Sequence, residues 1–157
     1  MGGLQLLKTM QQEDCASFVC QTQSGVVGGC TFKMHHIQSA STRLQTLLDD
    51  EASYEREPES FVELLLLGVT QKEQKNGLGA QLVHALQNFI SATGCSKVVT
   101  YADLRALAFF EKQGFVPFRQ KESQYYEIRK LLDRCDQSKL MCWRSPSAAD
   151  KLKRPKD

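Results

Sequence analysis

The most restrictive feature of this sequence is an apolar run that leads into a glycine-containing loop and then an amphipathic segment. The run spans residues 61–69 and contains one carboxylate, Glu63, and one glycine, Gly68. An apolar run of this length is typical of a strand buried on both faces, as in the centre of a parallel sheet. Gly68 predicts a bulge there, or the close approach of another backbone or a ligand. The sequence therefore predicts a central strand with two unusual positions.

The segments on either side predict further strands and helices. Apolar residues recur at a helical period from Leu78 to Ile90, and Gly94 ends that segment. Asp103 is a good N-cap for a helix over residues 104–113, which Gly114 stops. Strands are expected at residues 18–20, 26–32, 98–101, 115–118 and 139–143, the first two forming a hairpin. This order predicts a mixed α/β domain over residues 1–145.

Length and charge exclude several classes of protein. The chain has 157 residues, which is about one domain. Its 20 basic and 18 acidic side chains leave a formal charge of +2, without the basic excess of a nonspecific nucleic-acid binder. No apolar run approaches the roughly 18 residues of a membrane span. We therefore expect no direct binding of nucleic acid and no membrane association.

The cysteines and histidines do not form a recognisable site in the sequence. The six cysteines contain no C-x-x-C pair, and the three histidines complete no zinc-binding spacing with them. We therefore expect reduced structural thiols in an intracellular protein, and no metal. His84 lies opposite the apolar face of its predicted helix, and His35 and His36 adjoin a polar segment. All three histidines are expected to be solvated.

Two segments stand out by charge. Residues 35–60 carry six acidic and two basic side chains, a net charge of −4 from 2 minus 6, and are predicted to form an acidic insertion. A solvated loop and the rim of a groove for a basic peptide are equally good interpretations of it. Residues 146–157 are predicted to form a basic disordered tail, with a role in nuclear import as the alternative.

A loop with two glycines connects the apolar run to the predicted helix. It consists of Gln74, Lys75, Asn76, Gly77, Leu78, Gly79 and Ala80. The start of a helix offers unpaired N–H groups and the positive end of the helix dipole, which together favour a phosphate or pyrophosphate. The loop lacks the Lys-Ser/Thr of a P-loop and the third glycine of a Rossmann fingerprint. On spacing alone, a plain tight turn is the better interpretation.

This loop and several flanking strings resemble one family. Gln74 with Gly77 and Gly79 is similar to the acyl-CoA pyrophosphate motif of the GNAT superfamily of N-acetyltransferases. The strings F-V-E-L at 61–64, T-Y-A-D at 100–103 and K-Q-G-F at 112–115 resemble histone acetyltransferases of the general-control-nonderepressible and PCAF type. The strong resemblance covers residues 61–115, and a weaker one extends to Trp143. It implies a GNAT fold, with a mixed central sheet, splayed parallel strands and flanking helices.

The resemblance also implies site residues and a cosubstrate. Glu63 corresponds to the general base, and the backbone of Leu67, Gly68 and Val69 to the stretch that holds the acetyl and pantetheine end of acetyl-CoA. Residues 74–80 correspond to the pyrophosphate loop, and Arg105 replaces an aromatic residue that contacts coenzyme A. A lysine amine must lose a proton before it attacks, at a cost of about 4 kcal/mol at neutral pH. A carboxylate flanked by apolar residues suits the removal of that proton.

The departures from the family pattern keep other functions open. Asn76 stands where the family has a basic residue, and Phe110 stands where several small-molecule enzymes place a tyrosine acid, which favours the lysine-directed branch. The resemblance then implies a histone tail or another lysine-containing protein as substrate, a multisubunit chromatin complex, and the nucleus, with the cytoplasm as the alternative location. The competing hypotheses are acetylation of a small amine or a protein N-terminus, and a non-catalytic acyl-CoA-binding scaffold module.

Overall fold

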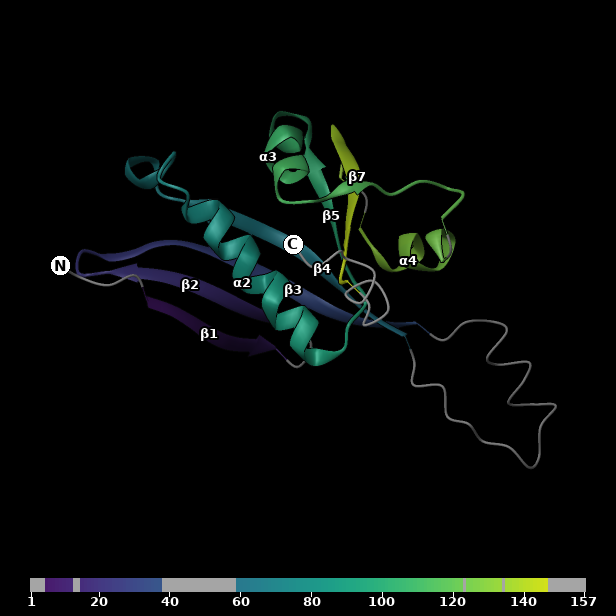
Figure 1. Cartoon of the computed structure of the whole chain (residues 1–157), viewed down its shortest axis with the longest axis horizontal. Coiled ribbons are helices and arrows are strands. Elements are labelled where there is room, and N and C mark those ends of the chain that lie inside the picture. The colour runs from purple at the N-terminus through teal and green to yellow at the C-terminus, as the bar shows by residue number, and fades with distance from the viewer. Residues whose placement is uncertain (1–4, 13–14, 38–58, 123, 134, 147–157) are drawn as a thin grey trace, which may run out of the picture.

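The described strands of the chain form one twisted sheet. The computed structural model describes residues 5–12, 15–37, 59–122, 124–133 and 135–146 (Figure 1). The seven strands of this part of the chain lie in the order β1-β2-β3-β4-β5-β7-β6. They are β1 (Gln5–Gln12), β2 (Cys15–Thr22), β3 (Gly25–Ile37), β4 (Glu59–Val69), β5 (Lys97–Asp103), β6 (Val116–Pro117) and β7 (Ser138–Arg144). The helices are α2 (Leu78–Thr93), α3 (Leu107–Lys112) and α4 (Tyr125–Leu131), with short 3-10 turns η1 (Gln71–Glu73) and η2 (Leu104–Ala106).

The first four strands are antiparallel neighbours. The predicted hairpin is confirmed, and both of its strands are longer than expected, since β2 and β3 together span residues 15–37 except for a tight turn. Strand β1 pairs along β2 and was not predicted.

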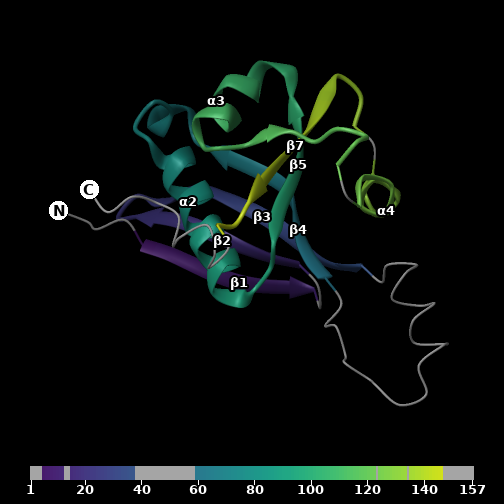
Figure 2. The ribbon, with the colours of Figure 1, turned by 45° about the vertical axis from the view of Figure 1, so that its right-hand side comes forward.

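Strand β4 is the junction of the sheet. It pairs antiparallel with β3 along its whole length, but it pairs parallel with β5 only where residues 61–63 meet residues 97–99. Beyond that point the two strands diverge (Figure 2). The Thr100 hydroxyl donates to the Leu64 carbonyl across 3.0 Å at the start of the divergence. The predicted burial on both faces therefore holds for residues 61–64 only, because Leu65 and Leu66 lie beside the opening and are 43% and 70% exposed.

Helix α2 covers one face of the sheet, as its apolar period predicts. Leu82, Leu86 and Ile90 are fully buried against β2, β3, β4 and β5. Gly77 precedes the helix with φ 77°, and Gly94 ends it with φ 80°. Both are left-handed conformations that glycine adopts without a steric penalty. The predicted start and end of this helix are confirmed.

Two hydrophobic clusters lie on opposite faces of the sheet. The first joins α2 and α3 to the sheet and includes Val62, Leu64 and Phe110. The second lies under α4 and includes Phe61 and Val99. Successive residues of β4 therefore belong to different clusters, as the alternation of side chains along a strand requires. Helix α4 was not predicted, because Ile128 is its only buried residue and gives no helical period.

The charged segments lie largely outside the described residues. Residues 38–58 of the expected acidic insertion and residues 147–157 of the expected basic tail are not described. The ends of the expected insertion belong to strands, since residues 35–37 are part of β3 and residues 59–60 part of β4. No described helix is long and apolar enough to cross a membrane.

Candidate functional site

The divergence of β4 and β5 opens a cleft of about 270 Å³. Its lining residues are Leu64, Leu65, Leu66 and Leu67 from β4, Thr100, Tyr101, Ala102 and Asp103 from β5, and Ala106, Phe109 and Phe110 from the turn and helix that follow. Beyond residue 63, the edge of β4 that faces β5 has no strand partner in the described part of the chain. Its backbone groups can therefore be offered to a ligand in the cleft.

The end of β4 connects this cleft to the glycine-containing loop. Leu67 lines the cleft, and the side-chain amide of Gln74 donates to the Val69 carbonyl at 3.2 Å. A Cβ added to Gly68 would meet no protein atom within 4 Å. The three strand positions expected to hold an acyl group thus lie beside the loop expected to hold a pyrophosphate.

The loop has the conformation of a tight turn that presents a helix N-terminus. Lys75 and Gly77 both have positive φ angles, 74° and 77°. The first backbone hydrogen bond of α2 runs from the Gln81 N–H to the Gly77 carbonyl, which leaves the preceding N–H groups at the open end of the helix. A Cβ on Gly79 would lie 3.3 Å from the Phe109 ring, closer than ordinary contact. The turn therefore leaves N–H donors at the start of α2, the arrangement that favours an anion, and has little room for a side chain at Gly79.

Glu63 lies on the other face of β4, just before the strands diverge. The residue is only 8% exposed. Its carboxylate Oε1 lies 2.9 Å from the Nε2 atom of His35 on β3. The His35 ring in turn stacks on Phe61, with centroids 4.8 Å apart and an interplanar angle of 12°. A carboxylate, an imidazole and an aromatic ring thus form one buried group on adjacent strands.

The expectation that His35 is solvated is wrong. The residue is 9% exposed and lies across from Phe61 in the β3–β4 register. It was missed because its partner lies 28 residues further along the chain, and only the strand register brings the two together. His36 and His84 are exposed, as predicted.

Comparison with known proteins identifies the family of this site. A family model described as the acetyltransferase (GNAT) family matches residues 4–115. The chain belongs to the GNAT family. This membership and the splayed sheet confirm the fold that the sequence resemblance implied.

Individual curated relatives match this GNAT domain over only part of its length. A segment of 56 residues is 38% identical to histone acetyltransferase GCN5 of Yarrowia lipolytica and 39% identical to that of Debaryomyces hansenii. That segment spans 35% of this chain and 12% of each relative. The likeness therefore covers a small part of those proteins.

Solved structures share the fold at low identity. The crystal structure of Tetrahymena GCN5 matches with a TM-score of 0.59 and 23% identity, over 85% of this chain and 70% of that one. Arabidopsis thaliana NAA60 in complex with acetyl-CoA matches with a TM-score of 0.59 and 16% identity, over 85% and 77% of the two chains. Both likenesses show the fold alone.

Arg105 of the GNAT domain lies outside the cleft lining. Its guanidinium pairs with the Asp103 carboxylate at 3.2 and 3.4 Å, and its side chain is 92% exposed. The hydrogen bond from Arg105 lowers the pKa of the Asp103 carboxyl. The Asp103 side chain also accepts the backbone N–H of Arg105, which confirms it as an N-cap, here of the turn η2.

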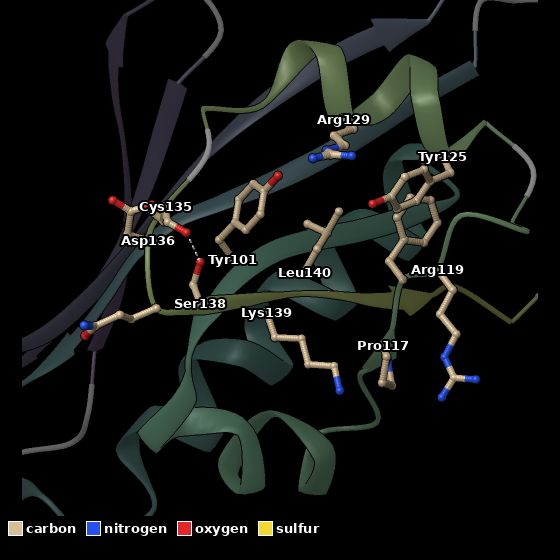
Figure 3. Close-up of a pocket in the computed structure, with 12 residues that line it drawn as sticks. Tyr101, Pro117, Arg119, Tyr125, Arg129, Cys135, Asp136, Ser138, Lys139 and Leu140 are labelled. Atoms are coloured by element: carbon tan, nitrogen blue, oxygen red, sulfur yellow. Dashed lines mark hydrogen bonds between the residues drawn. The ribbon is translucent and has the colours of Figure 1, made fainter.

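A second pocket, of about 360 Å³, lies on the Glu63 face of the sheet between β5, β7 and α4. Tyr101 follows Val99 by two residues, and Val99 is the register partner of Glu63, so Tyr101 and Glu63 share this face. Figure 3 shows Tyr101, Tyr125 and Arg129 extending towards one space beside Leu140. The Arg129 guanidinium lies 5.9 Å from the centre of the Tyr125 ring. Sequence reasoning missed this pocket because α4 was not predicted.

Proposed function

We propose that this GNAT domain transfers an acetyl group from acetyl-CoA to the side chain of a protein lysine, with a histone tail as the substrate. One observation carries the proposal: a buried carboxylate, Glu63, lies at the point where β4 and β5 separate. A segment of 56 residues of this chain is similar to histone acetyltransferase GCN5 of Yarrowia lipolytica and of Debaryomyces hansenii. A base at this place is next to the cleft proposed for the cosubstrate and lies on the face of the sheet that carries the second pocket.

The cleft and the loop fit acetyl-CoA. The exposed β4 edge at Leu67, Gly68 and Val69 would hold the acetyl and pantetheine end, and the turn before α2 would hold the pyrophosphate. The positive φ angles of that turn and the short distance from Gly79 to Phe109 indicate a backbone surface suited to close approach. Loop residues 74–80 would all contribute to this cradle. Arg105 would bind a phosphate only after it leaves Asp103.

Glu63 would act on the acceptor amine from the opposite face. Its carboxylate takes a proton from the lysine ammonium, directly or through a water molecule. The amine then attacks the thioester carbonyl, the new C–N bond forms, and the C–S bond breaks to release coenzyme A as its thiolate, which takes up a proton. Backbone N–H groups near residues 67–69 would stabilise the oxyanion that develops on the carbonyl.

The cysteines favour this direct transfer over a covalent enzyme intermediate. Burial raises the pKa of the Cys30 thiol to about 11 and also raises that of Cys142. At neutral pH such thiols are almost entirely protonated and are poor nucleophiles. No cysteine occurs in β4, which leaves the acceptor amine as the nucleophile.

The second pocket offers a place for residues beside the acceptor lysine. It lies on the Glu63 face and is lined by phenol and guanidinium groups as well as apolar atoms. A protein substrate has residues beside its lysine to place in this pocket, whereas a small amine has none. This observation favours a polypeptide acceptor over a small amine.

The test compares three acceptors with the wild-type domain and two variants. The acceptors are a histone-tail peptide with a blocked N-terminus, a lysine-free peptide with a free N-terminus, and spermidine. We expect turnover on the blocked, lysine-containing peptide. Glu63→Gln should lower kcat on that peptide by at least about 100-fold, while acetyl-CoA affinity stays near the wild-type value. Glu111→Gln, an exposed carboxylate on α3, is the matched control and should keep full activity.

The possible outcomes separate the competing functions. Turnover only on the free N-terminus or only on spermidine would replace the lysine assignment with the corresponding alternative. Binding of acetyl-CoA without turnover on any acceptor would favour the scaffold module. Near-normal turnover by Glu63→Gln would remove this residue from the mechanism.

A further inference from the structure

His35 and Glu63 form a buried hydrogen bond between an imidazole and a carboxylate, and the proposed reaction assigns no role to the imidazole. The two side chains are 8% and 11% exposed, and their closest atoms lie 2.9 Å apart. An ionised carboxylate has only acceptor sites, so the hydrogen in this contact must belong to Nε2 of the imidazole. Stacking on Phe61 holds the ring in the plane that directs Nε2 at Oε1. The orientation of the donor is therefore fixed by packing.

A carboxylate removed from water is stable only when its charge is compensated. His35 provides this compensation to one oxygen, Oε1. Among the described residues, the contact with His35 is made by Oε1 alone, which leaves the second oxygen, Oε2, as the atom available to an acceptor amine. The imidazole thus fixes which carboxylate oxygen is held and which is free.

We propose that His35 is a positioning residue for Glu63: its Nε2–H holds Oε1 and keeps the buried carboxylate oriented, with Oε2 directed at the acceptor amine. This inference rests on the proposed function of Glu63 and deepens it. His35 touches no reacting atom, and its effect passes entirely through the carboxylate. Proton transfer from the amine to Glu63 leaves the histidine hydrogen bond in place and changes no bond in His35.

Other titratable and charged groups share this face, and each can influence the pH dependence of the pair. Register and alternation place the following side chains on the face around it: Lys33, Lys97, Tyr101, Cys142, Arg144 and, from α4 and the segment before it, Arg129 and Glu122. Lys33 is the register partner of Glu63 itself, and Lys97 that of Phe61. Lys97 donates to Gln124 at 3.3 Å. A change in pH dependence must therefore be shown to need His35.

Three single variants isolate the histidine. His35→Phe keeps a ring to stack on Phe61 but removes the donor, so kcat on the histone peptide should fall about 10- to 100-fold, with acetyl-CoA affinity and peptide KM unchanged. His35→Gln keeps an N–H near the Nε2 position and should recover most of that loss. His36→Phe is the matched control, because His36 is the exposed neighbour and bonds Ser60 rather than Glu63. It should retain wild-type kcat.

The pH profile and a double variant identify the route of the effect. Without its donor the carboxylate loses the group that holds Oε1, so the pH profile of kcat/KM should change in His35→Phe and return towards wild type in His35→Gln. In the Glu63→Gln background, adding His35→Phe should change kcat by less than about twofold, because a positioning residue has nothing left to position. Full activity of His35→Phe, or independent multiplication of the two losses, would overturn the inference.

A spectroscopic measurement that does not depend on enzyme activity tests whether Nε2 of His35 carries the proton. Nitrogen NMR of the His35 ring in the wild-type protein should show a proton on Nε2. A neutral ring with the proton on Nδ1 alone would refute the contact on which the inference depends, even if His35→Phe does not fold. If the wild-type domain does not acetylate the histone peptide, the proposed function fails, and the ring-nitrogen result still judges the pairing separately.

Discussion

At the scale of single residues, the thiols of this protein differ in their environments although all six are free. Burial raises the pKa of Cys30 to about 11, whereas Cys135 is exposed. At pH 8, roughly one Cys30 side chain in a thousand is a thiolate, and the fraction grows only as the pH rises towards 11. Reactivity towards alkylating agents should follow this difference.

Limited alkylation with iodoacetamide at pH 8, followed by peptide mass spectrometry, measures that reactivity. We expect Cys135 to be modified first and Cys30 to remain unmodified in the folded protein. Unfolding in guanidinium chloride should expose all six thiols and serves as the control. Early modification of Cys30 under native conditions would contradict the burial described for it.

The same scale shows what a sequence can and cannot predict about a site. Glu63 and the turn at Gly77 and Gly79 were predicted because their surroundings are local: apolar neighbours for one, and the start of a helix for the other. The placement of His35 depends on how β3 and β4 align, which no short window of sequence records. The roles of Glu63 and the loop in catalysis and binding remain predictions.

At the scale of secondary-structure elements, two strands approach closely where β3 contains Gly28 and β4 contains Gly68. A Cβ on Gly28 would lie 2.9 Å from the Gly68 carbonyl oxygen, a distance that forces the backbone to move. A Cβ on Gly68 would meet nothing within 4 Å. The same substitution therefore has different consequences on the two strands.

Urea denaturation of the two alanine variants tests this difference. Gly28→Ala should lower the free energy of unfolding by about 1–3 kcal/mol, because the strand pair must separate to admit the methyl group. Gly68→Ala should stay within about 0.5 kcal/mol of wild type. Equal stabilities for the two variants, at equal dependence on urea concentration, would contradict the described spacing of the strands.

The helices and strands that could be predicted from sequence are those whose own residues carry a clear hydrophobic pattern. Helix α2 has four fully buried side chains, and its helical period identified it. Helix α4 has Ile128 as its only buried residue, and β1 is defined by its pairing with β2. Both were missed because their partners, rather than their own patterns, specify them.

At the scale of the whole molecule, a short stretch of parallel pairing between β4 and β5 joins the β1–β4 part of the sheet to the part formed by β5, β7 and β6. Strands β4 and β5 pair over three residues each, and the proposed acetyl-CoA cleft begins where that pairing ends. A ligand in the cleft would contact β4, β5 and α3 together. Its binding should therefore stabilise the chain as a whole against unfolding.

Thermal unfolding with acetyl-CoA tests this linkage. A ligand at about 100 times its Kd contributes about 2.7 kcal/mol, which corresponds to a rise in Tm of about 5–10 °C for a chain of this size. Gly79→Glu should abolish the rise, because its side chain and charge would occupy the crowded turn. Gln81→Glu adds the same charge at an exposed position on the same helix and should keep the rise. An undiminished rise in a folded Gly79→Glu variant would place acetyl-CoA elsewhere.

Strand β4 contains a β-bulge at Leu65, which constrains the number of residues in this strand more than it constrains which apolar residues they are. The β3–β4 register passes from Leu64 to Leu66 and skips Leu65. This one extra residue turns Leu67 and Val69 towards the α2 face, where both pack against the first cluster. Deletion of any single residue between Glu63 and Leu67 would reverse that orientation, and an insertion would do the same, whereas exchanges among apolar side chains would preserve it. In related chains, the identity of the apolar residues between the positions of Glu63 and Leu67 should therefore vary freely. The number of residues between those two positions should hardly vary.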